Sequence, residues 1–598
     1  MVRQPTSAWH LAVIKPRTRI VFCFFVFLFV SLALRLIFLQ FVQHRYYQAK
    51  ANLYQVRTAP LIAQRGLFLD RNGARLATNV PARWVSADPR IVKNADDVAG
   101  QLAPLLEMDK ARLLALLTPN PLRPHVQYVS LKRHVPVEIG LRISKANLLG
   151  INVVADTLRD YPYHSLAANV LGITNSDDQG MAGLELSQNK ILRGINGEVT
   201  VEVDKRGRFL PGTVHHHQEP VNGKSLRLTL DSALQNITES ELARAVTAHG
   251  AESGVGVVLD SQTGDILALA NVPTFDPNRP RPTGTMTQAQ ADALANSRRN
   301  RAVTDLYEPG STLKTITASA VLQELGLGEM DHYVYCPPIL QIGKYAIHEA
   351  PDALTRNLGS QNLRGILRVS SNVGMAQFGL RLGAQHLFEY ERKYGFLDKP
   401  GSGLAPEGHS HLRPPDWPRI QLANISFGQG VSVTALQLAS AYGAIANDGV
   451  LMRPHVIAGI QEGDKETPVK PEIIRQVLSP EVARAVRSML GTVVESGTGI
   501  PAQIAGYTVG GKTGSAQIAG KHGYEDGHYV ASFVGLYPLA HPRLVILCAI
   551  FKPQGIHWGA TVAAPVVHNV AQQAMHLLQI PPDAPVLTKT GRHTRHHT

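Results

Sequence analysis

The feature that most constrains this chain is a long apolar run near its N-terminus. From Ile20 to Val42 the run is interrupted only by Ser31, Arg35 and Gln40. As an α-helix it would extend about 34 Å at about 1.5 Å per residue, enough for one crossing of a bilayer core of about 30 Å. Residues 31–33 loosely fit a signal-peptidase site, but bulky apolar residues continue well beyond them. The run therefore predicts a retained transmembrane anchor over residues 20–42.

The charge of the chain is concentrated beside this run. The formal net charge is +13, and nine Lys or Arg residues precede Asp70, the first acidic residue. Basic residues next to an apolar run meet anionic lipid head groups, so the excess indicates a membrane surface rather than nucleic acid. No RNP, zinc-finger or helix-turn-helix pattern occurs, and we predict no nucleic-acid partner. Cys23, Cys336 and Cys548 match neither a disulfide framework nor paired metal-ligand spacing.

No second apolar run of this length follows, so nearly all of the protein lies on one side of the predicted anchor. We predict a cytoplasmic tail over residues 1–19. The positive-inside bias is weak, because Arg45, Lys50 and Arg57 follow the run closely. Arg35 inside the run is costly in lipid, which leaves two alternatives: it snorkels to the interface, or it faces a partner helix.

Residues 43–225 alternate short strand-like runs with turns and contain no obvious nucleophile. The pair Asn72-Gly73 predicts a hairpin turn, and the apolar spacing over residues 95–118 predicts helix. The triplet His215-His216-His217 lies in a polar stretch, where we expect a solvated loop rather than a metal site. These features predict a separate domain over residues 43–225.

From residue 226 onward the pattern changes. Two pairs of apolar runs, 254–259 with 265–270 and 531–537 with 544–551, predict hairpins at both ends of this region. Helical periodicity lies between them and again over residues 561–580. The arrangement predicts an α+β domain over residues 226–580, with an antiparallel sheet flanked by helices. We expect the basic, His-rich tail over residues 581–598 to be disordered.

The sharpest local pattern is the segment from Glu308 to Lys314, Glu-Pro-Gly-Ser-Thr-Leu-Lys. Pro-Gly before Ser311 predicts a helix start and Gly326 its end, and positions i and i+3 share a helix face, so we expect Ser311 and Lys314 to touch. A buried lysine can lose its proton and serve as base for a serine hydroxyl, while a helix N-terminus offers N–H groups to an oxyanion. Alone the pattern is weak, because residues 187–190 also read Ser-x-x-Lys.

Two further patterns follow in order along the chain. Ser370-Ser371-Asn372 begins another helix-like stretch, and Lys512-Thr513-Gly514 ends an extended, glycine-rich approach. A strand with the second triplet can pair with a peptide through backbone hydrogen bonds, and Gly514 would permit close approach. Lys512 and Thr513 offer a cation and a hydroxyl to a carboxylate. A second Lys-Thr-Gly at residues 589–591 lacks a flanking strand, and we set it aside.

The three motifs in this order form the set of the penicillin-recognising serine enzymes. On these motifs the chain resembles the class B penicillin-binding proteins, and most of all the division-type, septal peptidoglycan transpeptidases. Arg299-Asn300-Arg301 resembles a division-type marker. Five further stretches resemble the family: residues 65–73, 159–162, 180–185, 228–235 and 427–430. The resemblance spans nearly the whole chain and implies a penicillin-binding transpeptidase fold on a pedestal of the dimerisation type.

The resemblance also implies roles for the matching residues. Ser311 would be the acylated nucleophile, Lys314 its general base, Ser370 a proton relay, Asn372 the partner of the donor amide, and Lys512 the holder of the hydroxyl network. For the substrate, Thr513 would bind the carboxylate next to Gly514, and the N–H groups of Ser311 and Ser515 would form the oxyanion hole. No metal and no organic cofactor is implied.

Two positions depart from the family pattern. Ser515 replaces the usual threonine but keeps a hydroxyl, so we expect substrate recognition to be retained. Asn169 stands where relatives often show histidine, and we expect this difference to affect only the pedestal.

The implied reaction is acyl transfer from a D-Ala-D-Ala stem peptide to another strand's amine, inhibited by β-lactams. Alternatives stay open: an elongation-type transpeptidase, a D,D-carboxypeptidase, a membrane-tethered β-lactamase and a β-lactam sensor. By resemblance, the protein is a single-pass protein of the bacterial inner membrane, with its catalytic domain periplasmic or extracellular. The implied partners are peptidoglycan stem peptides, a polytopic glycan polymerase and other membrane proteins of the division complex.

Overall fold

The computed structural model describes residues 8–119, 126, 128–204, 209–280, 286–350, 357–412, 415–520 and 523–585. The chain forms two compact units, each built from several segments. The first contains Met1–Ile62, Ala82–Asp156 and Asn196–Val221; the second contains Ala63–Pro81, Thr157–Ile195 and Asn222–Thr598. The predicted disordered tail and the discarded triplet at 589–591 lie mostly or wholly outside the described residues.

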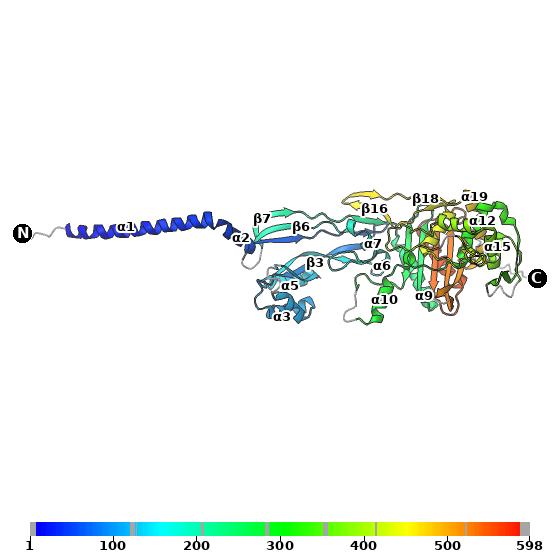
Figure 1. Ribbon diagram of the computed structural model, residues 1–598, viewed down its shortest axis with the longest axis horizontal. Coiled ribbons are helices and arrows are strands. Elements are labelled where there is room, and N and C mark those ends of the chain that lie inside the picture. Colours follow the sequence, from blue (N-terminus) through cyan, green and yellow to red (C-terminus); the bar gives the residue numbers. More distant parts are fainter. Residues whose placement is uncertain are drawn as a thin grey trace, which may run out of the picture. The chain divides into compact units, whose positions relative to one another are not determined.

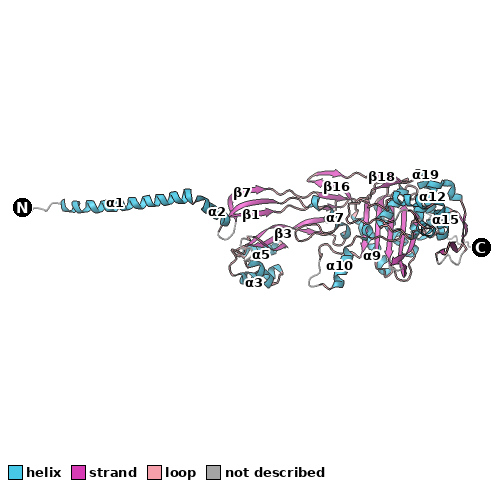
Figure 2. Cartoon of the chain, viewed as in Figure 1, coloured by secondary structure: helices cyan, strands magenta, loops and turns pink. Residues whose placement is uncertain are grey.

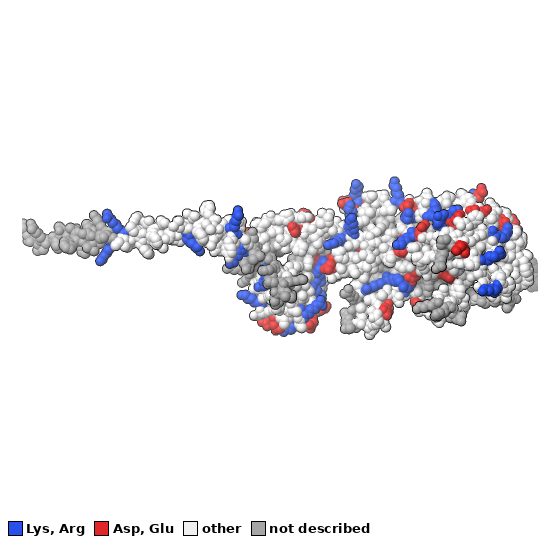
Figure 3. Space-filling model, viewed as in Figure 1, with Lys and Arg blue, Asp and Glu red and all other residues white. Residues whose placement is uncertain are grey.

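The first unit begins with a long helix, α1, Ala8–Ile37, which continues into the π-helical turn η1, Phe38–Val42. The segment Arg17–Val42 is long and apolar enough to cross a membrane, and none of its most apolar window is buried in the protein. Figure 3 shows this helix as a mostly white surface with basic side chains toward its ends. A further helix, α2, His44–Gln55, replaces the strand-like start expected at residue 43.

An antiparallel three-stranded sheet follows in the first unit, in the order β1 (Val56–Leu61), β6 (Gly197–Val203) and β7 (Phe209–Gln218) (Figure 2). The prediction of a loop at His215–His217 is wrong, because these residues lie on β7. Their side chains are exposed, and His215 and His216 face Glu202 and Glu198 of the neighbouring strand. Cross-strand pairing with these carboxylates accommodates the polar triplet in a strand.

The rest of the first unit surrounds a small apolar core of its own. Its helices are α3 (Ala95–Leu106), α4 (Lys110–Leu117) and α5 (Val137–Lys145), and strand β4 (Val129–Val135) pairs with the later part of β3 (Arg75–Ala87). The predicted helical region is therefore confirmed, with a break at Glu107, whose left-handed backbone ends α3.

The second unit is organised around a five-stranded antiparallel sheet. Its strands are β10 (Ile266–Val272), β9 (Ser253–Asp260), β21 (Leu544–Phe551), β20 (Gly523–Tyr537) and β19 (Gly510–Gly520), in that order. Both predicted hairpins are confirmed, since β9 pairs with β10 and β20 with β21. Strand β19 is at the edge of the sheet and pairs only with β20 among the described strands.

Helices cover both faces of this sheet (Figure 1). Along β21, Ile546 and Ile550 pack with α9 (Ser232–Ala248) and α21 (Ala564–Leu577). The alternate residues Val545 and Leu547 pack into the larger core that contains α12 (Lys314–Leu325) and α18 (Ala435–Ala446). This two-residue alternation explains why the sheet is buried on both faces.

The remaining elements of the second unit are short. A mixed sheet contains β17 (Lys465–Pro468), β16 (Ile457–Glu462), β8 (Ser225–Leu228), β2 (Phe68–Leu69) and the start of β3, and β5 (Ile151–Asp160) ends in this unit. Three small antiparallel pairs are β11 (Val334–Cys336) with β14 (Gly359–Gln361), β12 (Ile339–Ile342) with β13 (Tyr345–His348), and β15 (Val450–Met452) with β18 (Ile473–Gln476). The other helices are α6 (Ala168–Leu171), α7 (Gly183–Ser187), α8 (Asn189–Leu192), α10 (Gln288–Arg298), α11 (Arg301–Thr304), α14 (Leu363–Val369), α15 (Asn372–Leu382), α16 (Ala384–Lys393), α17 (Arg419–Ser426), α19 (Pro480–Ser496), α20 (Gly559–Val562) and the 3₁₀ turns η2 (Gly310–Thr312), η3 (Leu327–Asp331) and η4 (Ile500–Ala502).

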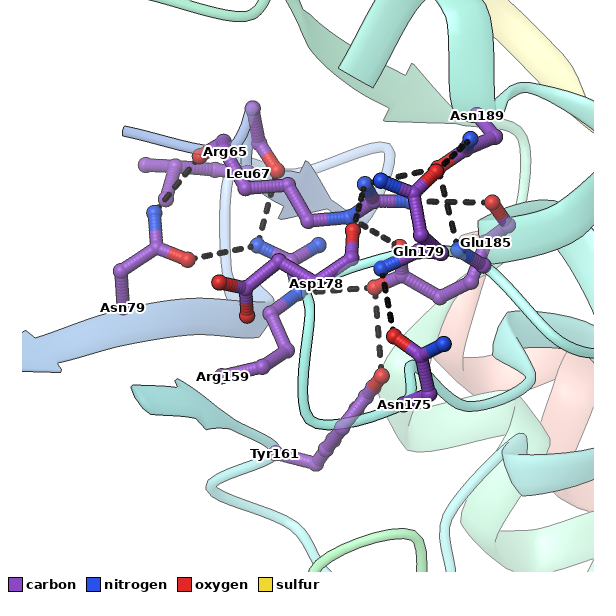
Figure 4. Close-up of polar contacts among 12 residues, drawn as sticks. Arg65, Leu67, Asn79, Arg159, Tyr161, Asn175, Asp178, Gln179, Glu185 and Asn189 are labelled. Atoms are coloured by element: carbon purple, nitrogen blue, oxygen red, sulfur yellow. Dashed lines mark hydrogen bonds and ion pairs between the residues drawn. The ribbon is translucent and has the colours of Figure 1, made fainter. Parts of the chain in front are cut away.

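A buried ionic network ties together segments of the second unit that are far apart in sequence (Figure 4). The Glu185 carboxylate accepts hydrogen bonds from Arg65 Nε at 2.6 Å and Arg159 Nε at 2.7 Å, and from the Tyr161 hydroxyl at 3.2 Å. The Glu185 side chain is 0% exposed. Because a buried charge needs partners, this network specifies how the three segments meet.

Asn169 contacts more than the pedestal segments, contrary to the expectation from sequence. Its Nδ2 donates to the carbonyl oxygens of Ser297 at 2.7 Å and Arg299 at 3.2 Å, and its Oδ1 accepts from the Thr274 hydroxyl at 3.0 Å. The side chain therefore holds the chain around Arg299-Asn300-Arg301. An amide can donate and accept at once, and it is nearly buried here.

Candidate active site

Ser311 lies in the 3₁₀ turn η2, directly before helix α12. The helix begins at Lys314 and ends at Leu325, with Gly326 as its C-cap, as the sequence predicts. Gly310 has a φ of +55° and packs against Ala516 of β19, where a side chain would be strained. The turn therefore presents Ser311 beside the edge strand.

The Lys314 ammonium is fully buried and makes three hydrogen bonds. Its Nζ donates to Asn372 Oδ1 at 2.7 Å, to the Ser370 carbonyl at 2.5 Å and to Ser370 Oγ at 3.4 Å. Among the described residues, no hydrogen bond joins Ser311 Oγ to Lys314 Nζ. The donors of the ammonium are instead directed at the three acceptors of the second motif.

The second motif lies at the junction of two helices. Ser370 is the C-cap of α14 and has a left-handed backbone, with φ 62° and ψ 36°. This conformation is unfavourable for a non-glycine residue, and it is retained here where its carbonyl and hydroxyl both accept from Lys314. Ser371 is the N-cap of α15, which begins at Asn372, so the helix start predicted from sequence is confirmed.

Lys512 of β19 reaches the same hydroxyl from the sheet. Its Nζ donates to Ser370 Oγ at 3.0 Å, and the residue is 0% exposed. Ser370 Oγ therefore lies between the ammonium groups of Lys512 and Lys314. The three motifs meet at this serine, as the sequence expectation requires.

Burial changes the protonation of both lysines. Desolvation lowers the pKa of Lys314 to about 7, against an opposing effect of the Glu349 carboxylate, which favours the charged form. Desolvation and the neighbouring charge of Lys314 hold the pKa of Lys512 well below its ordinary range. At neutral pH, Lys314 is therefore able both to accept and to release a proton.

The residues after Lys512 continue along the edge strand. The Thr513 hydroxyl shares a 2.9 Å hydrogen bond with the hydroxyl of Thr498, and Ser515 Oγ accepts from the Gly559 N–H at 3.0 Å. A Cβ at Gly514 would lie 2.4 Å from Ser532 Oγ and 3.0 Å from the Pro309 carbonyl. A side chain at this position would therefore collide with β20 and crowd the segment before Ser311.

Five of the predicted site residues line one cavity of about 650 Å³. From the sequence-predicted set, the cavity wall includes Ser311, Ser370, Asn372, Thr513 and Ser515, while the two buried lysines lie behind it. The match at residues 187–190 lies elsewhere: Ser187 Oγ donates to the Gly403 carbonyl, and Lys190 is exposed.

Three other parts of the wall lie outside the motifs predicted from the sequence. Thr498 follows α19 in a Ser-Gly-Thr-Gly segment, a glycine-rich break that is a usable signal for a loop at a site. Tyr529 stacks on His557 with ring centroids 3.7 Å apart, and both line the cavity. Glu349 lies on the wall just after β13, and no local sequence pattern identifies it.

Comparison with known families agrees with this geometry. Residues 254–572 match the model of the penicillin-binding protein transpeptidase domain. Residues 60–228 match the model of the penicillin-binding protein dimerisation domain. The chain belongs to the class B penicillin-binding proteins. Its C-terminal region has the transpeptidase fold, and this penicillin-binding protein is a serine-type transpeptidase, an acyltransferase.

Individual relatives cover most of this penicillin-binding protein. Stage V sporulation protein D of Bacillus subtilis is 32% identical, over 95% of this chain and 87% of the relative. Peptidoglycan D,D-transpeptidase FtsI of Buchnera aphidicola is 30% identical, over 94% of this chain and 95% of the relative. The crystal structure of penicillin-binding protein 3 from Mycobacterium tuberculosis, complexed with aztreonam, has a TM-score of 0.65 and 28% identity, and the match covers 88% of this chain and 99% of that one.

Proposed function

We propose that this protein is a membrane-anchored peptidoglycan D,D-transpeptidase that cross-links stem peptides through an acyl-Ser311 intermediate. Ser311 Oγ attacks the carbonyl carbon of the D-Ala-D-Ala amide, and the terminal D-Ala leaves as its free amine. An amine of a second strand then attacks the ester, which frees Ser311 and forms the cross-link. β-Lactams mimic the amide and stall at the acyl-enzyme.

The lysines and the second motif supply the proton transfers. Lys314, with its pKa lowered to about 7, accepts the proton of Ser311. Ser370 Oγ, hydrogen-bonded to Lys512 at 3.0 Å, passes a proton to the leaving amine. Asn372 holds Lys314 through Oδ1 and binds the donor peptide's amide.

The edge strand holds the substrate. Strand β19 has one free edge among the described strands, and a peptide can add to such an edge through backbone hydrogen bonds. Thr513 binds the substrate carboxylate, Gly514 keeps the strand close to the nucleophile, and the N–H groups of Ser311 and Ser515 form the oxyanion hole. Ser515 Oγ accepts from the Gly559 N–H, so its hydroxyl helps to fix the strand.

The observation that carries this proposal is the meeting of two buried ammonium groups on Ser370 Oγ behind a cavity lined by Ser311. Burying two lysines around one hydroxyl costs folding free energy and lowers their pKa values. This arrangement is therefore better explained by proton transfer than by a contribution to stability.

The experiment offers the full-length protein in detergent a stem-peptide analogue ending in D-Ala-D-Ala together with an amine acceptor. Mass spectrometry should detect D-Ala release and a new amide with the acceptor, both lost in Ser311→Ala. Hydrolysis without the new amide would identify a D,D-carboxypeptidase instead. Fast turnover of a penicillin would identify a β-lactamase.

We further propose the placement of the protein in the cell. Residues 20–42 cross the inner membrane once, residues 1–19 are cytoplasmic, and the catalytic region is periplasmic or extracellular. The pedestal spans residues 43–225 and the transpeptidase domain residues 226–580, which is supported by the family matches to 60–228 and 254–572.

Septal wall synthesis is the proposed role, supported by the Arg299-Asn300-Arg301 run. A polytopic glycan polymerase and other division-complex membrane proteins are the proposed partners, and Arg35 in the apolar helix is the candidate contact. If Arg35→Leu leaves complementation and recovery of the complex intact, this contact is excluded.

The septal role is tested by depleting the protein from cells. Depletion should block septation before it alters cell width, and the reverse order would favour an elongation role.

A further inference from the structure

The second motif is held by a carboxylate that lies outside all three motifs. Glu349 follows β13 and is 3% exposed. Its Oε2 accepts from the Asn372 N–H at 2.8 Å, and its Oε1 accepts from the Val373 N–H at 3.3 Å and from the Ser371 hydroxyl. Three donors at the N-terminus of α15 thus converge on one side chain. The partial positive charge of that helix end and a carboxylate attract each other, which holds the side chain at the start of α15.

The same segment fixes the amide of Asn372. The carbonyl of His348, next to Glu349, accepts from Asn372 Nδ2 at 3.0 Å, while Asn372 Oδ1 accepts from Lys314 Nζ at 2.7 Å. Because an amide has one donor end and one acceptor end, these two bonds set its orientation. Glu349, by binding the backbone N–H of Asn372, sets the position of that residue.

The carboxylate of Glu349 also offsets the positive charge of Lys314. Lys314 and Lys512 bring two buried ammonium groups to Ser370, and Glu349 is the charged group that favours the protonated form of Lys314. Removing the carboxylate would leave the two cations facing each other, with no anion among the described residues that acts on Lys314. A buried pair of like charges is costly without such a counter-charge.

We propose that Glu349 is a positioning residue for acyl transfer, which anchors the N-terminus of α15, orients Asn372 and supplies the counter-charge of Lys314. The inference rests on the proposed role of Lys314 as the base of Ser311. Glu349 acts through Asn372 and Lys314, and it is not itself a partner in the bond-making steps.

The other titratable groups near Glu349 and Lys314 are neutral or bind different partners. Cys336 of β11 neighbours Glu349, and burial raises the pKa of its thiol, so it is neutral. Tyr394, at the end of α16, hydrogen-bonds to Ser319, and Tyr442 of α18 hydrogen-bonds to Thr315. Both partners lie on α12, beyond Lys314. Arg487 of α19 donates to backbone carbonyls at the end of α18. Among the described residues, the charge that acts on Lys314 is therefore that of Glu349.

The test is the pH profile of acylation by a fluorescent penicillin, using the full-length protein in detergent. Glu349→Gln keeps the shape but removes the charge, so the pKa of Lys314 falls further. The acid limb of the profile should move to lower pH by about one unit, because the free base of Lys314 then persists at lower pH. The maximal rate should fall about tenfold or more, because one of the two oxygens that accept from Ser371, Asn372 and Val373 becomes an NH2 group, which cannot accept.

A purely structural role would lower the rate equally at every pH, and an unchanged midpoint in Glu349→Gln overturns the proposal. Glu391→Gln, a buried carboxyl of α16 outside the site, is the matched control and should leave the profile unmoved. If Glu349→Gln does not fold, Glu349→Asp keeps the charge with a shorter reach. It should acylate more slowly with the midpoint near that of the unaltered protein, and an unaltered rate overturns the proposal.

The failure of this inference and of the proposed function are distinguishable. If the unaltered protein forms no adduct, the proposed function fails. If it acylates normally and Glu349→Gln shares its rate and profile, only the role of Glu349 fails.

Discussion

Lys314 and Lys512 both donate hydrogen bonds to Ser370. Of the two, Lys314 also donates to Asn372 Oδ1, and the carboxylate of Glu349 acts on its charge. With its pKa lowered to about 7, the ammonium of Lys314 becomes the free base as the pH rises through that value. Only the free base can take the Ser311 proton. We therefore assign the acid limb of the pH profile of acylation to Lys314.

The first prediction is that acylation by a penicillin rises between about pH 6 and pH 8, with a midpoint near the pKa of Lys314, about 7. Stopped-flow fluorescence with a fluorescent penicillin measures the rate. Lys314→Arg should abolish acylation, because a guanidinium stays protonated throughout this range. An acylation rate that stays flat from pH 6 to pH 8 contradicts the assignment.

The second prediction concerns Glu391 of α16, which is 0% exposed and whose two carboxylate oxygens have no hydrogen-bond partner among the described residues. Desolvation raises its pKa well above the ordinary 4.5. The unfolded chain ionises above pH 4.5 while the folded one stays neutral, so the native state loses about 1.4 kcal/mol per pH unit until the folded pKa is reached.

Glu391→Gln should therefore raise the unfolding free energy at pH 7, and the difference should disappear near pH 4. Denaturant unfolding at both pH values measures this. Glu389→Gln, on the same helix and bound to Gln385, should change little at either pH. An equal effect of Glu391→Gln at both pH values would show that ionisation is not its cause.

At this scale, the sequence predicts the chemistry of the three motifs but not the contacts that tune it. Ser311, Lys314, Ser370 and Lys512 could be found because their spacing along the chain repeats a known set. Glu349 could not, because it meets Asn372 only through the packing of the β13 segment on α15. Likewise, the missing Ser311–Lys314 bond depends on acceptors supplied by a distant helix junction.

Among the elements, the buried network of Arg65, Arg159 and Glu185 joins segments from three parts of the second unit (Figure 4). The third prediction is that Glu185→Gln lowers the unfolding free energy by about 3–5 kcal/mol, since it leaves two buried guanidinium groups without an anion. Denaturant or thermal unfolding of the full-length protein measures the loss.

The matched control is Glu466→Gln, which breaks the half-exposed pair of Glu466 with Arg227. Solvent screens such a pair, so the loss should be about 0–1 kcal/mol. Equal losses for Glu185→Gln and Glu466→Gln would contradict the role of burial in the network.

Elements with strong local patterns could be predicted, and those that depend on distant partners could not. The β9–β10 and β20–β21 hairpins and helix α12 follow from apolar alternation, helical spacing and turn residues. Strand β7 was missed because His215–His217 lack apolar alternation, and the carboxylates that pair with two of them come from β6. The edge position of β19 depends on the order of the strands, which no local pattern contains.

For the whole molecule, the proposed membrane anchor rests on one helix that is long and apolar enough to cross a bilayer. The fourth prediction is that the full-length protein sediments with membranes and is released by detergent but not by high salt. Burial of apolar side chains in lipid is not screened by ions, whereas attraction between basic residues and head groups is. Release by salt alone, or a membrane-bound form whose intact mass lacks residues 20–42, would contradict the anchor.

The most direct test of the account is to incubate the full-length protein with a penicillin and to follow intact mass and peptide maps over hours. The account predicts one lasting adduct, on Ser311, absent in Ser311→Ala and retained in Ser187→Ala, whose serine belongs to the decoy motif. No adduct on folded protein, an adduct on another residue, or rapid loss of the adduct with turnover of the drug would contradict it.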